Sequence, residues 1–92
     1  MNYCFRTFYI QEHMLESLKA YIEQHRPVGG FLTAVLENNL MEACGRADDD
    51  NLANLPAFCA YLYNDAPSAC HGSPKKVQAW LAARKASPPP AP

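Results

Sequence analysis

The densest collection of side chains capable of binding chemistry lies between residues 63 and 76. Its members combine hydrogen-bonding and cationic groups: Tyr63, Asn64, His71, Ser73, Lys75 and Lys76. Tyr63 and Asn64 end a predicted helix and the others follow in a loop and the start of the next helix, which are places where binding residues gather. The pattern predicts a ligand or partner site. The structural alternative is that Asn64 caps its helix and Tyr63 is a half-buried ring.

Two glycine-containing turns could each bind an anion. Gly29-Gly30 precedes one predicted helix, and Gly72-Ser73-Pro74 precedes another whose first turn adds Lys75 and Lys76. Backbone N–H groups at a helix N-terminus favour negative charge, so a phosphate or a nucleotide is a candidate ligand at Gly30 and at Ser73. Neither turn has the spacing of a Walker loop or follows a predicted strand. The competing interpretation is ordinary capping and solvation, with Ser73 as the N-cap of the last helix and Pro74 in its first turn.

Polar residues also interrupt the apolar pattern in the middle of the chain. Asn38 and Asn39 are adjacent, and Asn39 falls inside an apolar stripe, where its amide either bonds the backbone of a neighbouring helix or turn or belongs to a polar ligand pocket. The acidic run 48–50 lacks the alternating ligands of a calcium loop. We expect one of its members to cap the next helix, and we include Asp48 among the candidate binding residues.

Nothing in the sequence predicts catalysis, a metal or a cofactor. Cys70 and His71 are adjacent, but neighbouring side chains seldom meet as nucleophile and base, and no third group is indicated. The cysteines are separated by 40, 15 and 11 residues without a C-x-x-C pair, which disfavours zinc. Cys44 and Cys59 fall on apolar helix faces, so we expect buried, reduced thiols.

Length and charge restrict the classes of protein further. The chain has 92 residues, 49% of them hydrophobic, which predicts one domain over residues 1–86, with an arm at 1–10, followed by a disordered Pro-rich tail at 87–92. A net charge of −1 provides no broad basic surface and so disfavours nucleic-acid binding. No apolar run approaches the roughly 20 residues of a membrane helix, so we expect no membrane insertion and no secretion.

The apolar periodicity predicts an all-α, four-helix domain. Helices are expected over 11–26, from about 31 to 45 or 47, from near Asp49 to the residue before Pro67, and over 74–85, with Trp80 anchoring the last to the core. The middle two should pack as an antiparallel pair. Pro56 either kinks the third helix, which we prefer, or begins a new one with Asn54 or Leu55 as cap.

The aromatic arm is the least regular part of the prediction. Residues 3–10 are β-branched and aromatic enough to be extended, yet no other segment predicts a strand. The arm could therefore be irregular, pair with its copy in a dimer, or begin the next helix early. Together with the aromatic content of 11%, which a core this small cannot hide, the unpaired arm predicts a homodimer.

Several segments resemble small helical proteins encoded by tailed bacteriophages and prophages. The similarity covers about residues 11–83 and is carried by P-x-G-G-F-L-x-A-V-L-x-N-x-L-x-E-A (27–43), R-A-D (46–48), L-Y-N-x-x-P (62–67) and G-S-P-x-x-V-x-x-W-L (72–81). The resemblance implies a phage origin and a bacterial host cytoplasm, without a mechanism. The arm and the tail lie outside the shared block.

These observations favour a non-catalytic phage accessory protein that binds and interferes with a host component, such as a defence factor. One alternative is a sponge-like binder of a nucleotide signal, using the two helix N-termini, Tyr63 and Lys75 or Lys76. Another is a small DNA-binding regulator, although few outward cations are available for it.

Overall fold

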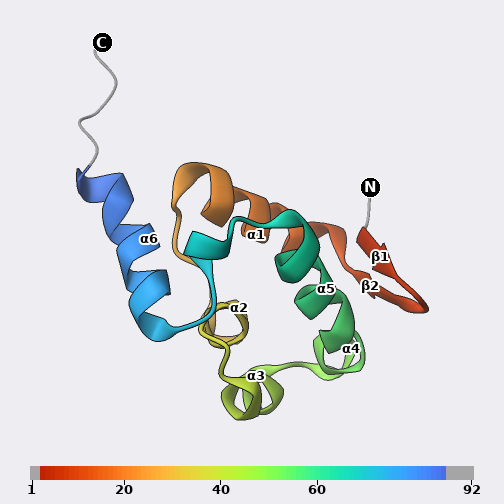
Figure 1. Cartoon of the computed structure of the whole chain (residues 1–92). Helices are drawn as coiled ribbons and strands as arrows, with labels where there is room; N and C mark the ends of the chain where they lie inside the picture. Colours follow the sequence, from red (N-terminus) through yellow and green to blue (C-terminus); the bar gives the residue numbers. More distant parts are fainter. Residues whose placement is uncertain (1–2, 87–92) are drawn as a thin grey trace.

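The computed structural model describes residues 3–86, without the side chains of residues 84–86. Helices dominate it, as expected, and a small two-stranded sheet precedes them (Figure 1). In chain order the elements are β1 (Tyr3–Phe5), β2 (Phe8–Ile10), α1 (Glu12–Gln24), α2 (Gly30–Leu36), α3 (Leu40–Arg46), α4 (Asp49–Ala53), α5 (Leu55–Asp65), a 3₁₀ turn at Ser68–Cys70, and α6 (Pro74–Ala86). The predicted tail at 87–92 lies outside the described residues.

The aromatic arm is a β-hairpin, which none of the three expected alternatives anticipated. β1 and β2 pair antiparallel with Tyr3 opposite Ile10 and Phe5 opposite Phe8. Arg6 adopts a left-handed φ of 56° in the turn between them. The strand partner was missed because it lies within the same short segment. Because β1 and β2 pair with each other, the arm does not need a partner strand from a second copy. This reason to expect a dimer is therefore removed.

The hairpin packs on α5 and is fixed there by Asn54. The backbone N–H of Tyr9 donates to Asn54 Oδ1 at 2.9 Å, and Asn54 Nδ2 donates to the Asp50 carbonyl at 2.8 Å. Asn54 is only 7% exposed, and these two bonds satisfy both the oxygen and the nitrogen of its buried amide. The rings of Tyr3 and Tyr61 add an edge-to-face contact with centroids 5.1 Å apart.

The single helix predicted from about residue 31 to 45 or 47 is wrong, because the chain turns sharply after Leu36. Asn38 has a left-handed φ of 62° and ends α2, since a helix cannot continue through that conformation. Asn39 then caps α3: its Oδ1 accepts from the Glu42 backbone N–H at 3.3 Å. Asn tolerates the left-handed region better than most residues, so the Asn38-Asn39 pair is a turn signal that the apolar period concealed.

The expected kink at Pro56 is also wrong, and the alternative of a new helix is confirmed. α4 ends at Ala53, Asn54 is the N-cap residue of α5, and Pro56 lies in its first turn. There the missing proline N–H costs nothing, because that position has no intrahelical acceptor. The expected acidic cap is confirmed as well: Asp48 Oδ1 accepts from the Asn51 N–H at 2.8 Å.

The core forms where α1, α2, α5 and the hairpin meet. Phe31 of α2 packs edge-to-face on Phe58 of α5, with ring centroids 5.1 Å apart. The predicted antiparallel pair is nevertheless wrong: in Figure 1 α2 is seen nearly end-on while α5 runs up the view, so the two helices cross. α3 packs mainly on α2. Within residues 3–86, no helix has the length and hydropathy needed to cross a bilayer.

Trp80 anchors α6 to the C-terminal end of α1, as expected. Its Nε1–H donates to the Tyr21 carbonyl at 2.8 Å, and the carbonyl of Trp80 lies 2.8 Å from His25 Nδ1. Because a carbonyl only accepts, Nδ1 carries a proton in this pair. The hydroxyl of the fully buried Tyr21 donates to the Cys70 carbonyl at 2.7 Å. These bonds tie the last third of the chain to α1.

The break at Asn38 can be tested by a pair of substitutions. Because φ is positive there, Asn38→Ala should lower the free energy of unfolding by about 1 kcal/mol, whereas Asn38→Gly should stay within about 0.5 kcal/mol of wild type. Urea denaturation measures both values. An uninterrupted helix would produce the opposite order, with alanine more stable than glycine by about 1 kcal/mol.

The hairpin anchor leads to a second stability prediction. Asn54→Ala removes the partner of the Tyr9 N–H and should cost about 1–3 kcal/mol. Asn64→Ala, at an exposed position on the same helix, is the matched control and should change stability by no more than about 0.5 kcal/mol. Equal effects of the two substitutions, measured by urea denaturation, would show that the Asn54 bonds do not hold the hairpin.

Candidate functional site

An apolar groove runs along the outer side of α5. It consists of two pockets that share Cys59. The first, about 40 Å³, lies toward α3, and the second, a shallow hollow of about 590 Å³, lies toward the hairpin. We call this surface the α5 groove; its lining residues are Phe5, Val35, Asn38, Asn39, Leu40, Ala43, Leu55, Pro56, Cys59, Ala60, Tyr63 and Asn64.

The floor of the groove is the stripe of α5 beside its buried side; Leu55 is half-buried against the core, whereas Cys59 and Tyr63 are exposed. Leu55, Cys59 and Tyr63 recur every four residues on that side, while Phe58 and Leu62 are buried on the other. Tyr63 is 87% exposed, so its ring projects into solvent with little support from the fold. A helix that is apolar on both sides but covered on only one leaves a surface suited to a partner.

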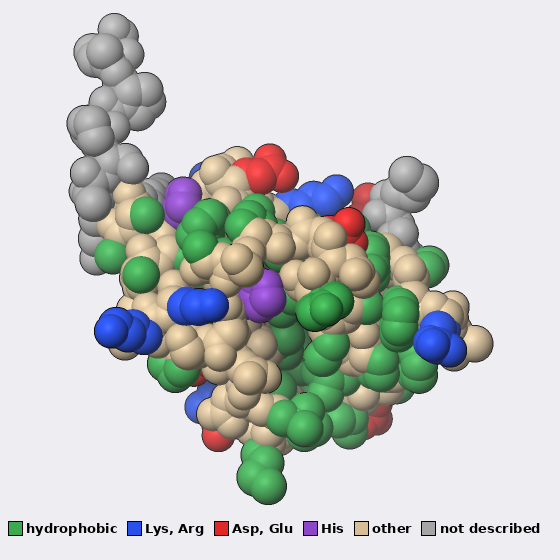
Figure 2. Space-filling view, in the orientation of Figure 1, with side chains coloured by type: hydrophobic (Ala, Val, Ile, Leu, Met, Phe, Trp, Pro, Cys, Tyr) green, Lys and Arg blue, Asp and Glu red, His purple; other side chains and the backbone are tan. Residues whose placement is uncertain are grey.

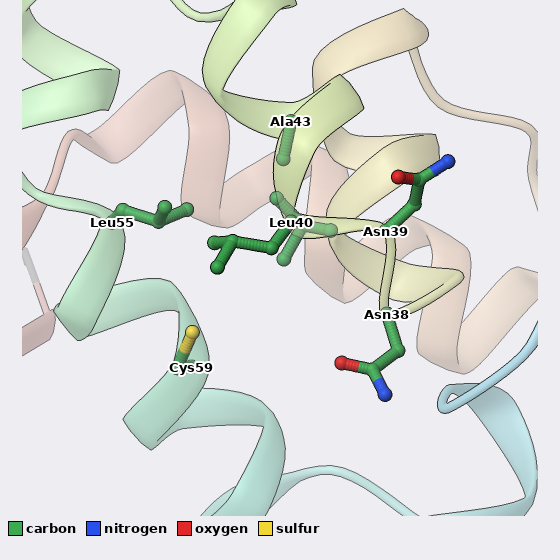
Figure 3. A pocket seen from close by; sticks show the side chains of 7 residues that line it. Asn38, Asn39, Leu40, Ala43, Leu55 and Cys59 are labelled. Carbon is green, nitrogen blue, oxygen red and sulfur yellow. The ribbon is translucent and has the colours of Figure 1, made fainter.

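The walls come from α3 and the hairpin. Leu40 begins α3, is 62% exposed, and extends toward Leu55 and Cys59 (Figure 3). Phe5 of β1 lines the opposite pocket. Leu40 takes this position because the turn at Asn38 redirects the chain, so the groove depends on the helix break that the sequence analysis missed.

The two asparagines lie at the α3 end of the groove. Their amides are on the side away from Leu55, with Asn39 pointing away from Cys59 (Figure 3). Asn39 was expected to be buried and is exposed; its side-chain oxygen bonds the backbone of the helix it begins. Asn39 thus bonds backbone, although within its own helix, and it lines one pocket of the groove; its role in ligand binding stays a prediction.

The thiols differ from the prediction. Cys44 and Cys59 were expected in the core and are exposed, because the helix break and the new start at α5 changed which side of each helix faces inward. Cys70, expected in a loop, is fully buried, and burial raises the pKa of its thiol. Burial likewise raises the pKa of the Cys59 thiol. Raised pKa values keep thiols protonated and poorly nucleophilic.

The start of α6 holds four of the predicted binding residues together. Ser73 Oγ accepts from the Lys76 backbone N–H at 3.2 Å, which confirms the predicted cap, and Lys76 Nζ donates to the Ser68 carbonyl at 3.3 Å. Lys75 follows Pro74 and is exposed. His71 is half-buried and bonds the Leu62 backbone. Burial and then Lys76 lower its pKa, and the Leu62 bond partly opposes them.

Gly30 and Asp48 do not join this group. Gly30 lines a separate hollow of about 340 Å³ with Glu37, Glu42 and Arg46, and Arg46 bonds Glu42 at 2.6 Å. The Gly72 N–H donates to the Leu36 carbonyl at 2.7 Å, so the loop before α6 meets the C-terminal end of α2. Gly30 begins α2. The two glycine turns thus lie at opposite ends of one helix, and no single small ligand is held between them.

Sequence reasoning missed three residues that shape the site. Asn54 was considered only as a cap, Phe5 only as part of an arm, and Leu40 as core. A signal existed for Leu40, because it directly follows two asparagines, the typical pattern of a turn. None existed for Phe5 or for the Asn54 bond to Tyr9, since each depends on contact between segments about 45 to 55 residues apart.

The arrangement offers binding by apolar contact with polar and cationic groups nearby. Among the described residues, no three His, Cys, Asp or Glu side chains are grouped to hold a metal ion. Comparison with protein-family models, with curated proteins and with solved structures found no match.

The pKa of His71 makes stability depend on pH. Because the folded pKa lies below the ordinary 6.5, the unfolded chain takes up a proton that the folded chain excludes, and the free energy of unfolding should fall as pH drops below about 6.5. His71→Gln should remove this contribution, and Lys76→Gln should reduce it. Urea denaturation at about pH 5.5 and about pH 7.5 measures the difference. An unchanged pH dependence in His71→Gln would refute this assignment.

Proposed function

We propose that the chain is a non-catalytic binding protein of a bacteriophage that interferes with a component of the bacterial host through the α5 groove. The exposed apolar groove carries this proposal. Tyr63 and Leu40 are large apolar side chains that are 87% and 62% exposed on either side of Cys59. Exposing such side chains together gains nothing for the isolated fold, whereas burying aromatic and aliphatic anchors is what stabilises a protein interface.

The shape of the groove favours a macromolecule over a small ligand. The pocket toward α3, about 40 Å³, is far smaller than the roughly 300–1,000 Å³ of ordinary ligand pockets. The hollow toward the hairpin, about 590 Å³, falls within that range but is shallow and open to solvent, so it would enclose little of a small molecule. Shallow apolar surfaces of this kind suit protein segments that cover them from above.

The setting of this function comes from the resemblance to phage proteins. A phage protein acts in the cytoplasm of its bacterial host, where a defence factor is a candidate partner. Sequestration of a nucleotide has less support, because the two helix N-termini invoked for it lie at opposite ends of α2. The start of α6, with Ser73 and Lys76, remains the place where such a ligand would bind.

Capture from bacterial lysate tests the proposal. Tagged protein should retain a specific host protein, identified by mass spectrometry, and Tyr63→Glu with Leu40→Glu should lose it, because both substitutions place carboxylates in the groove at positions that the fold hardly contacts. Leu52→Glu is the matched control, since Leu52 is also exposed but lines neither pocket. If the groove variants still retained the host protein, the groove would be rejected as its binding site.

A thermal-shift assay with cyclic and linear nucleotides tests the alternative. On our proposal no nucleotide raises the melting temperature. A shift of several degrees that is lost in Lys76→Ala, but kept in Tyr63→Glu with Leu40→Glu, would replace groove binding by nucleotide sequestration at the start of α6.

A further inference from the structure

We propose that the partner of the α5 groove is an acidic amphipathic helix, whose apolar stripe fills the groove and whose Asp and Glu side chains contact cations on both rims. This inference rests on the proposed function and specifies the chemistry of the partner. It is carried by the combination of an uncharged floor with basic residues on two separate elements.

The floor has the dimensions of a helix-binding surface. α5 has 11 residues and is therefore about 16 Å long, which corresponds to about three turns of an opposing helix. Cys59 and Ala60 are small side chains at its middle, and the larger Leu55 and Tyr63 stand toward its ends. A ridge of side chains on a second helix can enter this central depression, as in other complexes where an amphipathic helix occupies an apolar groove.

One rim carries Arg6 of the hairpin turn. Its guanidinium lies 5.4 Å from the centre of the Phe5 ring, and Phe5 lines the groove. This stacking holds an exposed cation beside the apolar surface, where it can pair with a carboxylate on a bound segment. The hairpin itself is fixed to α5 by the Asn54 bonds, so the cation belongs to a supported element.

The opposite rim carries the start of α6. The Gly72–Leu36 bond places this segment at the C-terminal end of α2. Asn38, two residues after Leu36, lines the groove. Lys75 and Lys76 are exposed there. Figure 2 shows Lys and Arg side chains at the left and right margins of this face, with a largely hydrophobic area between a central His and the right margin; Asp and Glu side chains appear above this area and at its lower edge.

The carboxylates closest in sequence to the groove residues are directed to other places. Glu37 and Glu42 line the hollow at Gly30. Asp65 comes four residues after the buried Tyr61 and two after Tyr63, so helical geometry puts it on the side of α5 that carries Tyr61, and it lines neither pocket. No Asp or Glu of the described residues lines either pocket of the groove. Two copies packed through this face would bring cationic rims together, so charge favours an acidic partner over a second copy.

Peptide binding to the full chain tests this inference. Three labelled peptides of about 15 residues are compared by fluorescence anisotropy: a leucine stripe at helical spacing flanked by Glu, the same stripe flanked by Lys, and a Glu-rich peptide with the stripe scrambled. The Glu-flanked peptide should bind at least about tenfold more tightly than either of the others at low salt. Its advantage over the Lys-flanked peptide should shrink at about 0.5 M salt.

Charge reversal provides the control. Arg6→Glu combined with Lys76→Glu should shift the preference toward the Lys-flanked peptide, whereas Lys19→Glu, on α1 and outside the groove, should leave it unchanged. Equal affinity for the two striped peptides would overturn the acidic partner while leaving groove binding intact. The acidic partner would also be overturned, with groove binding intact, if the groove variants lost lysate capture but none of the three peptides bound the wild-type chain.

Two further outcomes would also overturn the inference. Sedimentation that shows a dimer at micromolar concentration, abolished by Tyr63→Glu, would assign the groove to a second copy. Unchanged peptide binding in Tyr63→Glu with Leu40→Glu would show that the peptides bind elsewhere, and would count against the proposed function as well.

Discussion

The packing of α5 between the hairpin and α2 is the constraint on which the rest of the structure depends. One side of this helix is held by aromatic contacts, with Phe58 against Phe31 and Tyr61 against Tyr3. These contacts fix the rotation of α5 about its axis. Once Phe58 faces inward, Cys59 and Tyr63 must face outward, because positions one and five residues further along a helix lie about 100° and 140° away around its axis. The exposed stripe is therefore a consequence of the core.

Polar groups, used sparingly, hold this packing in place. Asn54 satisfies a hairpin N–H and a carbonyl of α4 from one buried amide, and Tyr21 and Trp80 each place a side-chain donor on a backbone carbonyl of a distant element. Burial, with smaller contributions from Cys70 and Glu37, raises the pKa of Tyr21 well above its usual range. Its hydroxyl therefore stays a donor at any physiological pH. In a domain of this size such bonds specify how elements meet, because apolar contacts alone have little directional preference.

The proposed binding surface and the stable core are separate in this molecule. Tyr63 and Leu40, the exposed large hydrophobic residues of the groove, contribute little to the fold, whereas the structural residues Asn54, Tyr21 and Trp80 lie outside the groove. Several predicted binding residues proved to be structural: Asp48 and Ser73 cap helices, and Asn39 does so while also lining the groove. Capping and binding draw on the same short polar side chains, so residue type alone does not separate the two roles.

The sequence by itself determined the helical class, the Ser73 cap, an acidic cap within residues 48–50, and the anchoring of Trp80, because these follow from local signals of period, capping chemistry and size. It did not determine where the middle helices end. Apolar periodicity continued through Asn38, and only the left-handed backbone at that residue, stabilised by the packing of α3 on α2, separates two helices. The pairing of β1 with β2 and the bond from Tyr9 to Asn54 were decided by tertiary structure, as was the groove. A groove exists only where separate segments meet, and contacts between residues about 45 positions apart leave no periodic trace in either segment.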